Sequence, residues 1–291
     1  MVKKLSQLHL EMRKALLTAE EPQIADQYAR SLLCHVTGKS HAQLLADREM
    51  YVSDSICETV DAYLQRLLAG EPLAYVLGEW EFYGLPLTVN SNVLIPRDDT
   101  CAVVDLAIKY ALFLNEKPRI LDLCTGSGCI GLAIASRIHD SRITLADISP
   151  EALAVAKTNA ARNHMTGNVT CVRADALKRP APFLGKFDMI ISNPPYITSD
   201  EMLQLPTSVK DFEPHLALHG GEDGLIFYRS IIEHYTSILN PGGYLCFEFG
   251  EGQGDDICQL LTANQYTILE RSRDYNDIER AVIAQYGRKE N

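Results

Sequence analysis

The sequence lacks several features that would assign it to particular classes of protein. No apolar run approaches the roughly 18–20 residues of a membrane-spanning helix. The first 14 residues interleave charge with leucine, unlike a signal peptide. None of the eight cysteines forms a C-x-x-C pair, which argues against zinc knuckles and disulfide frameworks and for reduced thiols. We therefore expect a soluble, cytoplasmic protein without a bound metal.

A strongly basic region is also missing. The 291 residues have a formal net charge of −11. Residues 1–72 carry 8 basic and 10 acidic side chains, and residues 73–291 carry 19 basic and 28 acidic ones. Proteins that bind nucleic acid neutralise its phosphates with clustered lysine and arginine, and no such cluster stands out here. We therefore expect neither nucleic acid nor membrane as a direct partner.

Residues 1–72 have the apolar periodicity of helices. Pro22 suits a first helical turn and Gly38 a helix end, while Ser40 and Ser55 each precede Gln or Glu by three residues, as in a capping box. The expected buried positions are Leu5, Leu8, Met12, Ala15/Leu16, Ile24, Tyr28, Leu32/Leu33 and Val36. The pattern predicts a small all-helical domain for packing or docking.

The pattern changes after residue 72. Apolar residues alternate on both sides of Gly84, so residues 73–96 are predicted to be a β-hairpin that connects two domains. From residue 97 to 291 short apolar strands alternate with helices, which predicts a doubly wound, mostly parallel α/β sheet whose last strand is antiparallel. The seven expected strands are RILDLC (119–124), RITLAD (142–147), VTCVRAD (169–175), FDMIIS (187–192), YLCFEFG (244–250, after the stop NPGG), YTILERS (266–272) and RAVIAQY (280–286).

Three polar segments follow strands of this predicted sheet. They are the glycine loop DLCTGSGCIG (122–131), Asp147 and Asn193-Pro-Pro-Tyr196. Ligands of doubly wound sheets bind beyond the carboxyl ends of the strands, so these segments predict the site. The glycine spacing, with an acidic residue about 20 positions further on, is also the dinucleotide fingerprint, and a hydride-transferring dehydrogenase is one interpretation.

Two observations favour S-adenosylmethionine over a dinucleotide. Asp122 precedes the loop, and a carboxylate suits a ligand with an ammonium and a sulfonium better than a pyrophosphate. In addition, Asn-Pro-Pro-Tyr fits methylation of a planar nitrogen, because the Asn193 oxygen and a proline carbonyl can each accept one N–H of the target. Tyr196 can pack on the flat face of that target. Asp175, with the Ala176 backbone beside it, would then face the adenine amino group.

The sequence resembles the PrmC/HemK-type methyltransferases, which modify the glutamine of the Gly-Gly-Gln motif in class-1 peptide chain release factors. The resemblance covers the helical N-terminal block, GEWEFYGLPLTVNSNVLIPR, ILDLCTGSGCI, ADIS, SNPPYI, FEPHLALHGGEDGLIFYRSII and FEFGEGQGDDI. It implies a class I, Rossmann-like, monomeric enzyme that converts S-adenosyl-L-methionine to S-adenosyl-L-homocysteine and methylates the N5 nitrogen of that glutamine. Residues 1–72 would dock the release factor.

The resemblance also implies individual site residues. Together with Asp122, the cofactor site would comprise Cys124, Thr125, Gly126, Ser127, Gly128, Asp147, Asp175, Ala176 and Asn193. The glutamine would be bound by Asn193, Pro194, Pro195 and Tyr196, of which Asn193, Pro194 and Tyr196 are the expected catalytic residues, with Arg97 near the site at the domain junction.

The chain departs from the family pattern I-P-R-P-[ED]-T-E at two positions, where it has Asp98 and Cys101. Three other interpretations remain open: a glutamine methylase of a large-subunit ribosomal protein, an adenine-N6 DNA methyltransferase, and a docking scaffold without catalytic activity.

Overall fold

The computed structural model describes residues 3–114 and 117–287, and the chain forms two compact units. One unit comprises residues 1–78 together with 207–212, and the other comprises residues 79–206 and 213–291. The chain therefore leaves the second unit after Pro206 and returns to it at Glu213. Within the described ranges, no helix combines the length and the apolar composition needed to cross a membrane.

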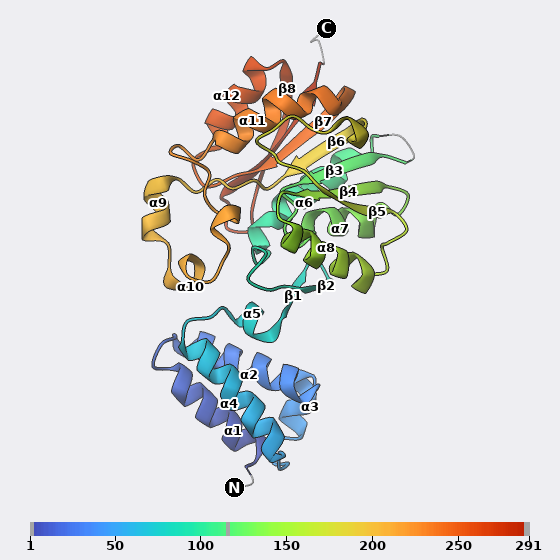
Figure 1. Ribbon diagram of the computed structural model, residues 1–291. Coiled ribbons are helices and arrows are strands. Elements are labelled where there is room, and N and C mark those ends of the chain that lie inside the picture. Colours follow the sequence, from blue (N-terminus) through green and yellow to red (C-terminus); the bar gives the residue numbers. More distant parts are fainter. Residues whose placement is uncertain (1–2, 115–116, 288–291) are drawn as a thin grey trace. The chain divides into compact units, whose positions relative to one another are not determined.

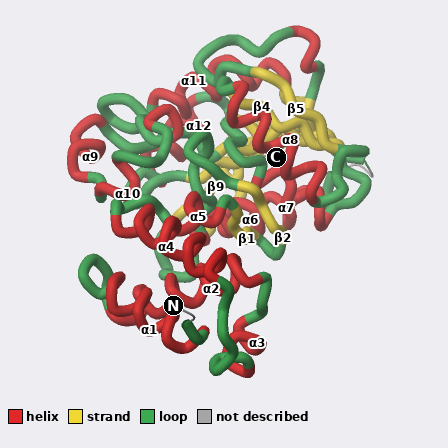
Figure 2. The backbone as a smooth tube through the Cα atoms, turned by 60° about the horizontal axis from the view of Figure 1, so that its bottom comes forward, coloured by secondary structure: helices red, strands yellow, loops and turns green. Residues whose placement is uncertain are grey.

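The first unit contains helices and loops throughout its described residues, as Figure 2 shows in red and green. Its core is an apolar cluster that includes Leu8, Met12, Leu32 and Val60, all 1 % exposed or less. The helices are α1 (Leu5–Leu16), α2 (Pro22–Thr37), α3 (His41–Ala46), α4 (Asp54–Leu68), α5 (Leu73–Leu77) and α10 (Thr207–Lys210).

Most of the predicted helix boundaries in this unit are confirmed. Pro22 lies in the first turn of α2, Gly38 ends that helix with φ of 65°, and Ser40 forms a capping box with Gln43. The predicted capping box at Ser55 is wrong, because Ser53 caps α4 by accepting from the Ile56 N–H.

Two further predictions for the first unit are wrong in detail. The buried face of α2 carries Ala25 and Ala29, whereas Ile24 and Tyr28 are only partly covered. The prediction followed the larger side chains, Ile24 and Tyr28, and therefore placed the buried face of α2 one residue too early. In addition, residues 73–77, expected as part of the hairpin connector, form helix α5, which buries Leu73 and Val76 in the helical core.

The second unit holds a separate β-hairpin and a seven-stranded sheet (Figure 1). The predicted hairpin is confirmed as β1 (Glu79–Phe82) and β2 (Leu85–Thr88). The sheet order is β5-β4-β3-β6-β7-β9-β8, and only β9 runs against the other strands. The strands are β3 (Arg119–Leu123), β4 (Arg142–Asp147), β5 (Val169–Arg173), β6 (Phe187–Ser192), β7 (Leu239–Glu248), β8 (Tyr266–Arg273) and β9 (Glu279–Tyr286).

Successive residues of each central strand contribute to different cores. Ile120 and Cys246 face one core and Leu121 and Leu245 face the other, the period-two alternation of a sheet covered on both sides. The first core is closed by the hairpin with α6 (Cys101–Ala111), α7 (Cys129–Arg137) and α8 (Pro150–Arg162). The second is closed mainly by α11 (Ile226–Tyr235) and α12 (Gly254–Ala263).

Strand β7 begins earlier than the sequence predicts. The NPGG stretch, expected to stop a helix before the strand, lies inside β7, and the pairing with β6 jumps from Leu239 to Tyr244. The extra residues form an irregularity that the strand tolerates at its amino end.

The strand order places a switch point between β3 and β6. Strands β3, β4 and β5 follow one another towards one edge of the sheet, and β6 and β7 follow towards the other. The loops after β3 and β6 therefore diverge, which leaves a crevice beyond their carboxyl ends.

Candidate active site

A cavity of about 360 Å³ lies at this switch point. This volume falls in the range of small-molecule sites. It brings together ten of the predicted site residues: Arg97, Cys124, Thr125, Gly126, Ser127, Asp147, Asp175, Ala176, Asn193 and Pro195. The other four, Asp122, Gly128, Pro194 and Tyr196, are not part of its lining.

Each glycine of the loop between β3 and α7 meets a different requirement. Gly126 has φ of 54° and no heavy atom within 4 Å of the place where a Cβ would be, so a ligand can approach its backbone. Gly128 has φ of 84° and caps α7. A Cβ on Gly131 would overlap the Leu145 side chain, so this glycine allows α7 to pack closely on β4.

Asp122 supports this loop from the side away from the cavity. The side chain is fully buried, and its Oδ2 accepts from the Thr125 hydroxyl at 2.6 Å and from the Gly131 N–H at 2.9 Å. Burial raises the pKa of Asp122 to about 7 despite these bonds. We expected Asp122 to contact a cationic ligand directly. The structure corrects this expectation, because the carboxyl group is fully buried, is hydrogen-bonded to the loop and does not line the cavity.

Asp147 supports the same loop from the side of the cavity. Its Oδ2 accepts from the Gly126 N–H at 2.9 Å, and its Oδ1 accepts from the Ser149 N–H at 3.0 Å. Burial raises the pKa of this carboxyl, while the backbone donors oppose the shift. Two carboxylates thus hold the glycine loop, and only Asp147 also lines the cavity.

Asp175 and Ala176 lie just beyond β5 and contribute another part of the lining. The Asp175 carboxylate accepts from the Leu177 N–H at 2.9 Å and pairs with Lys178 at 3.1 Å. The carbonyl of Ala176 accepts from the Ser230 hydroxyl at 2.8 Å, which ties this turn to α11.

The Asn193–Tyr196 loop is held by close backbone packing. A Cβ on Gly220 would lie 2.7 Å from the Pro195 carbonyl oxygen, and one on Gly224 would collide with the Tyr196 carbonyl. The Gln253 side chain donates to that same carbonyl at 3.1 Å and accepts from the Gly250 N–H at 2.9 Å.

The Tyr196 ring packs on Gly250, where a Cβ would come within 3.0 Å of the ring. Burial raises the pKa of Tyr196 to about 12, so the phenol is neutral at physiological pH. The runs HGGEDGL (219–225) and GEGQG (250–254) therefore support this loop. In the sequence they stood out only as part of the family resemblance.

Sequence reasoning missed one wall of the cavity. Leu94 and Pro96 line it from the segment after the hairpin, and Leu216 and Phe227 line it from the region after residue 213. Glu213, 4 % exposed, joins these walls by accepting from the Ile95 N–H at 3.3 Å and from the Arg97 guanidinium. The only signal in the sequence was that LIPR and FEPHLAL occur among the family-specific runs.

Of the two positions that depart from the family pattern, Asp98 lies in the 3-10 turn just before α6 and Cys101 is the first residue of α6. Cys101 is half-buried among carboxyl groups, and its pKa is raised to about 11 by burial and by Asp105, Asp98, Glu248 and Asp99 in that order. The thiol is therefore neutral, where a glutamate would add a further negative charge.

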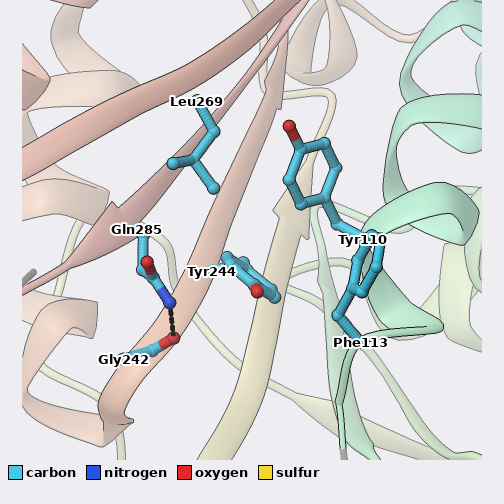
Figure 3. Close-up of a pocket in the computed structure, with 6 residues that line it drawn as sticks. All are labelled: Tyr110, Phe113, Gly242, Tyr244, Leu269 and Gln285. Carbon is cyan, nitrogen blue, oxygen red and sulfur yellow. Dashed lines mark hydrogen bonds between the residues drawn. The ribbon is translucent and has the colours of Figure 1, made fainter.

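A larger hollow of about 590 Å³ is open to solvent elsewhere on the second unit (Figure 3). Tyr110, Phe113 and Tyr244 provide aromatic walls, and Gln285 donates to the Gly242 carbonyl at 2.7 Å. Gly242 and Tyr244 are the fourth and sixth of the ten residues of β7, so neither lies at its carboxyl end. Among the described residues, the lining of the hollow contains no carboxylate, glycine loop or strand terminus, so we do not assign the active site to it.

Comparisons with known proteins identify the relatives of this chain. Residues 7–78 match the PrmC N-terminal domain, and residues 107–209 match the methyltransferase small domain. The chain is 39% identical over 264 residues to a release factor glutamine methyltransferase of Haemophilus influenzae, covering 87% of this chain and 88% of that one. The chain belongs to the release factor glutamine methyltransferase family.

Two further family members support this membership. The relative from Bradyrhizobium diazoefficiens is 38% identical over 275 residues, which are 93% of this chain and 91% of the relative. The relative from Clostridium acetobutylicum is 36% identical over 256 residues, which are 88% and 90% of the two chains.

Solved structures agree with the fold at low identity. The hMettl16 catalytic domain, in complex with MAT2A 3'UTR hairpin 6, has a TM-score of 0.57 at 13% identity and covers 84% of this chain and 87% of that one. A methyltransferase from Pyrococcus furiosus has a TM-score of 0.51 at 19% identity and covers 78% and 100%. The seven-stranded Rossmann-like methyltransferase fold that the sequence predicts is thereby confirmed.

Proposed function

We propose that this protein transfers a methyl group from S-adenosyl-L-methionine to the side-chain amide nitrogen of the glutamine in the Gly-Gly-Gln motif of class-1 peptide chain release factors. The observation that carries the proposal is that Asn193 and Pro195 of the Asn-Pro-Pro-Tyr loop line one cavity with the glycine loop at the switch point. The names of the relatives, release factor glutamine methyltransferases, supply the substrate class.

The residues of the cavity fit this cofactor. Gly126 leaves its backbone open, and Ser127 has a buried hydroxyl without a hydrogen-bond partner beside it. Asp147 is the carboxylate that we propose for the ribose hydroxyls, and Asp175 with Ala176 is proposed for the adenine. When bound, S-adenosylmethionine supplies an electrophilic methyl group.

The reaction requires the target nitrogen to be aimed, since an amide nitrogen is a poor nucleophile. We propose that the Asn193 Oδ1 and the Pro194 carbonyl accept the two N–H groups of the glutamine, which favours a pyramidal nitrogen with its lone pair directed at the methyl group. Rigid alignment of reactants can lower a barrier by up to about 7–11 kcal/mol. The packing of Gly220 and Gly224 against this loop supports such rigidity.

Other parts of the chain have proposed roles as well. We propose that the helical N-terminal region docks the release factor, that Arg97 acts at the edge of the glutamine site, and that the enzyme works as a monomer in the cytoplasm. All eight cysteines are free thiols, which suits a reducing compartment.

The direct test is transfer of radiolabel from methyl-labelled S-adenosylmethionine to a class-1 release factor. A release factor whose Gly-Gly-Gln glutamine is changed to alanine serves as the matched control. We expect label on the first protein and none on the second. Label on both would mean that the target residue is wrong.

If neither release factor is labelled, the alternatives separate experimentally. Label on a large-subunit ribosomal protein or on DNA would replace the proposed substrate. Calorimetric titration with S-adenosylhomocysteine and with NAD(H) tests the cofactor independently, and tight binding of NAD(H) alone would favour the dehydrogenase. Binding of S-adenosylhomocysteine without any transfer would favour a docking scaffold.

A further inference from the structure

Glu248 is a buried carboxyl group beside the proposed glutamine site. It ends strand β7 and is 2 % exposed. Strand β6 pairs with β7 in parallel, and the last pair in the register is Ser192 with Phe247. The next residues along these strands are Asn193 and Glu248, so the sheet itself brings the two side chains to the same edge.

The two oxygens of Glu248 have different surroundings. Oε1 accepts from the Thr100 hydroxyl at 3.2 Å, and Thr100 is itself 2 % exposed and lines the cavity. Oε2 is fully buried and has no hydrogen bond of ordinary geometry. The Asn193 side chain lies close enough to favour the ionised carboxylate by hydrogen bonding. A buried carboxylate with an unsatisfied oxygen is costly, so this arrangement calls for a functional explanation.

The charged and titratable neighbours of Glu248 come from several elements. Burial is the largest influence and raises the pKa of Glu248 to about 8. The charge of Asp99 also raises this pKa, and the charge of Arg280 lowers it. The negative charge of Glu248 raises the pKa of five nearby groups, which are the tyrosines Tyr196 and Tyr228 and the thiols of Cys101, Cys129 and Cys246.

We propose that Glu248 is a positioning residue that fixes which way the Asn193 side-chain amide points. An ionised carboxylate can only accept hydrogen bonds, so it binds the Asn193 Nδ2 and leaves Oδ1 to face the cavity. That oxygen is the one assigned above to an N–H of the glutamine. This inference rests on the proposed function.

The protonation state of Glu248 then controls the arrangement. A protonated Glu248 carries an O–H donor and a carbonyl acceptor, so it can bind either end of the Asn193 amide. With the amide reversed, Nδ2 would face the N–H groups of the substrate, and the acceptor would be lost. The active form is therefore the ionised one, and activity rises with pH as Glu248 loses its proton.

The test compares Glu248→Gln with wild type and with Glu233→Gln, a control at a carboxylate whose side chain is 73 % exposed on α11. We expect the wild-type and control kcat/KM to rise at least about tenfold between pH 6 and pH 9, because kcat/KM reports ionisations of the free enzyme. For Glu248→Gln we expect a flat profile and a loss of about 10–100-fold at pH 9, typical of removing the partner that orients a reacting group.

A second variant keeps the carboxylate and guards against misfolding of the first. Thr100→Val removes one donor to Glu248 with little change of shape, so the rise in activity should shift to higher pH by about one unit. A purely structural role of Glu248 would lower activity equally at all pH values and would leave this midpoint unchanged.

The outcomes separate this inference from the proposed function. If wild type and Glu233→Gln fail to methylate the release factor while they bind S-adenosylhomocysteine, the proposed function is wrong. If they methylate it and Glu248→Gln keeps the wild-type pH rise, or Thr100→Val leaves the midpoint in place, the role assigned to Glu248 is wrong.

Discussion

The glycine loop after β3 and the Asn-Pro-Pro-Tyr loop after β6 lie on neighbouring strands but are held in different ways. Carboxylates hold the first through backbone N–H groups, with Asp122 bound to Gly131 and Asp147 bound to Gly126. The second is held by glycine backbones packed against it and by Gln253. Hydrogen bonds to two carboxyl groups therefore hold the glycine loop, whereas close backbone contacts leave the other loop little room to move.

Because we propose that the second loop aims the nucleophile, the change of Asn193→Ala should have the largest effect. We expect kcat to fall roughly 10²–10³-fold, as when one oriented polar group is removed from an active site. The dissociation constant for S-adenosylhomocysteine, measured by calorimetry, should change little. An equal loss of cofactor affinity and turnover would mean that Asn193 acts mainly on the cofactor.

The packing of the second loop is tested by Gly224→Ala. Its Cβ would collide with the Tyr196 carbonyl and lie 2.5 Å from the Gln253 amide nitrogen. We expect kcat to fall by about 10²-fold, since a displacement of about 1 Å in an active site can cost that much.

The control for Gly224→Ala is Gly84→Ala, in the turn between β1 and β2. Gly84 has φ of 78°, similar to the 72° of Gly224, but nothing lies within 4 Å of the position of its Cβ. Both variants therefore carry the same backbone strain, and only one disturbs the loop. Equal loss of turnover in the two would show that strain, and not packing against Tyr196, causes the effect.

The support of the first loop is tested by Asp122→Asn, whose effect on stability should depend on pH. The pKa of Asp122 is raised from 3.8 to about 7 in the folded protein, so the folded state holds this proton more tightly than the unfolded state. Its stabilising contribution is complete below pH 4 and is lost as pH rises through 7.

Relative to Asp122→Asn, the wild type should therefore lose about 2–3 kcal/mol of unfolding free energy between pH 5 and pH 8. Urea denaturation of both proteins across this range measures the difference. A constant difference between the two would contradict the proposed titration of Asp122.

The smallest effect is expected outside both loops. Gln285→Ala removes the hydrogen bond to the Gly242 carbonyl in the larger hollow (Figure 3). Stability should fall by about 1 kcal/mol and methyl transfer should be unchanged. A clear loss of turnover would mean that this hollow takes part in the reaction.

The same comparison explains how far sequence reasoning reached. The supports of the glycine loop are near in sequence, 9 residues apart for Asp122 and Gly131 and 21 for Gly126 and Asp147. That spacing is itself the recognisable motif, although it did not reveal that Asp122 accepts hydrogen bonds from the loop and does not line the cavity. The mostly parallel sheet and its antiparallel last strand could likewise be predicted from alternating short segments, whereas the strand order comes from the structure.

The contacts of the second loop and of the cavity wall join residues that are far apart in sequence. Gln253 is 57 residues from Tyr196 in this loop, and Glu213 is 116 residues from Arg97 in the wall. No local pattern connects such pairs, and a glycine needed for close approach looks the same in a sequence as a glycine in any turn. Glu248 was missed for a related reason, because its position beside Asn193 depends on the register between β6 and β7.

The excursion of residues 207–212 into the helical unit limits how this protein can be divided. Helix α10 and Phe212 belong to the same compact unit as residues 1–78, and a Cβ on Gly70 would meet the Phe212 ring at 3.7 Å. A chain shortened to residues 79–291 would keep this segment without the helices that cover it. Exchange of the helical unit between relatives would therefore require two grafts, one at the N-terminus and one in the middle of the catalytic unit.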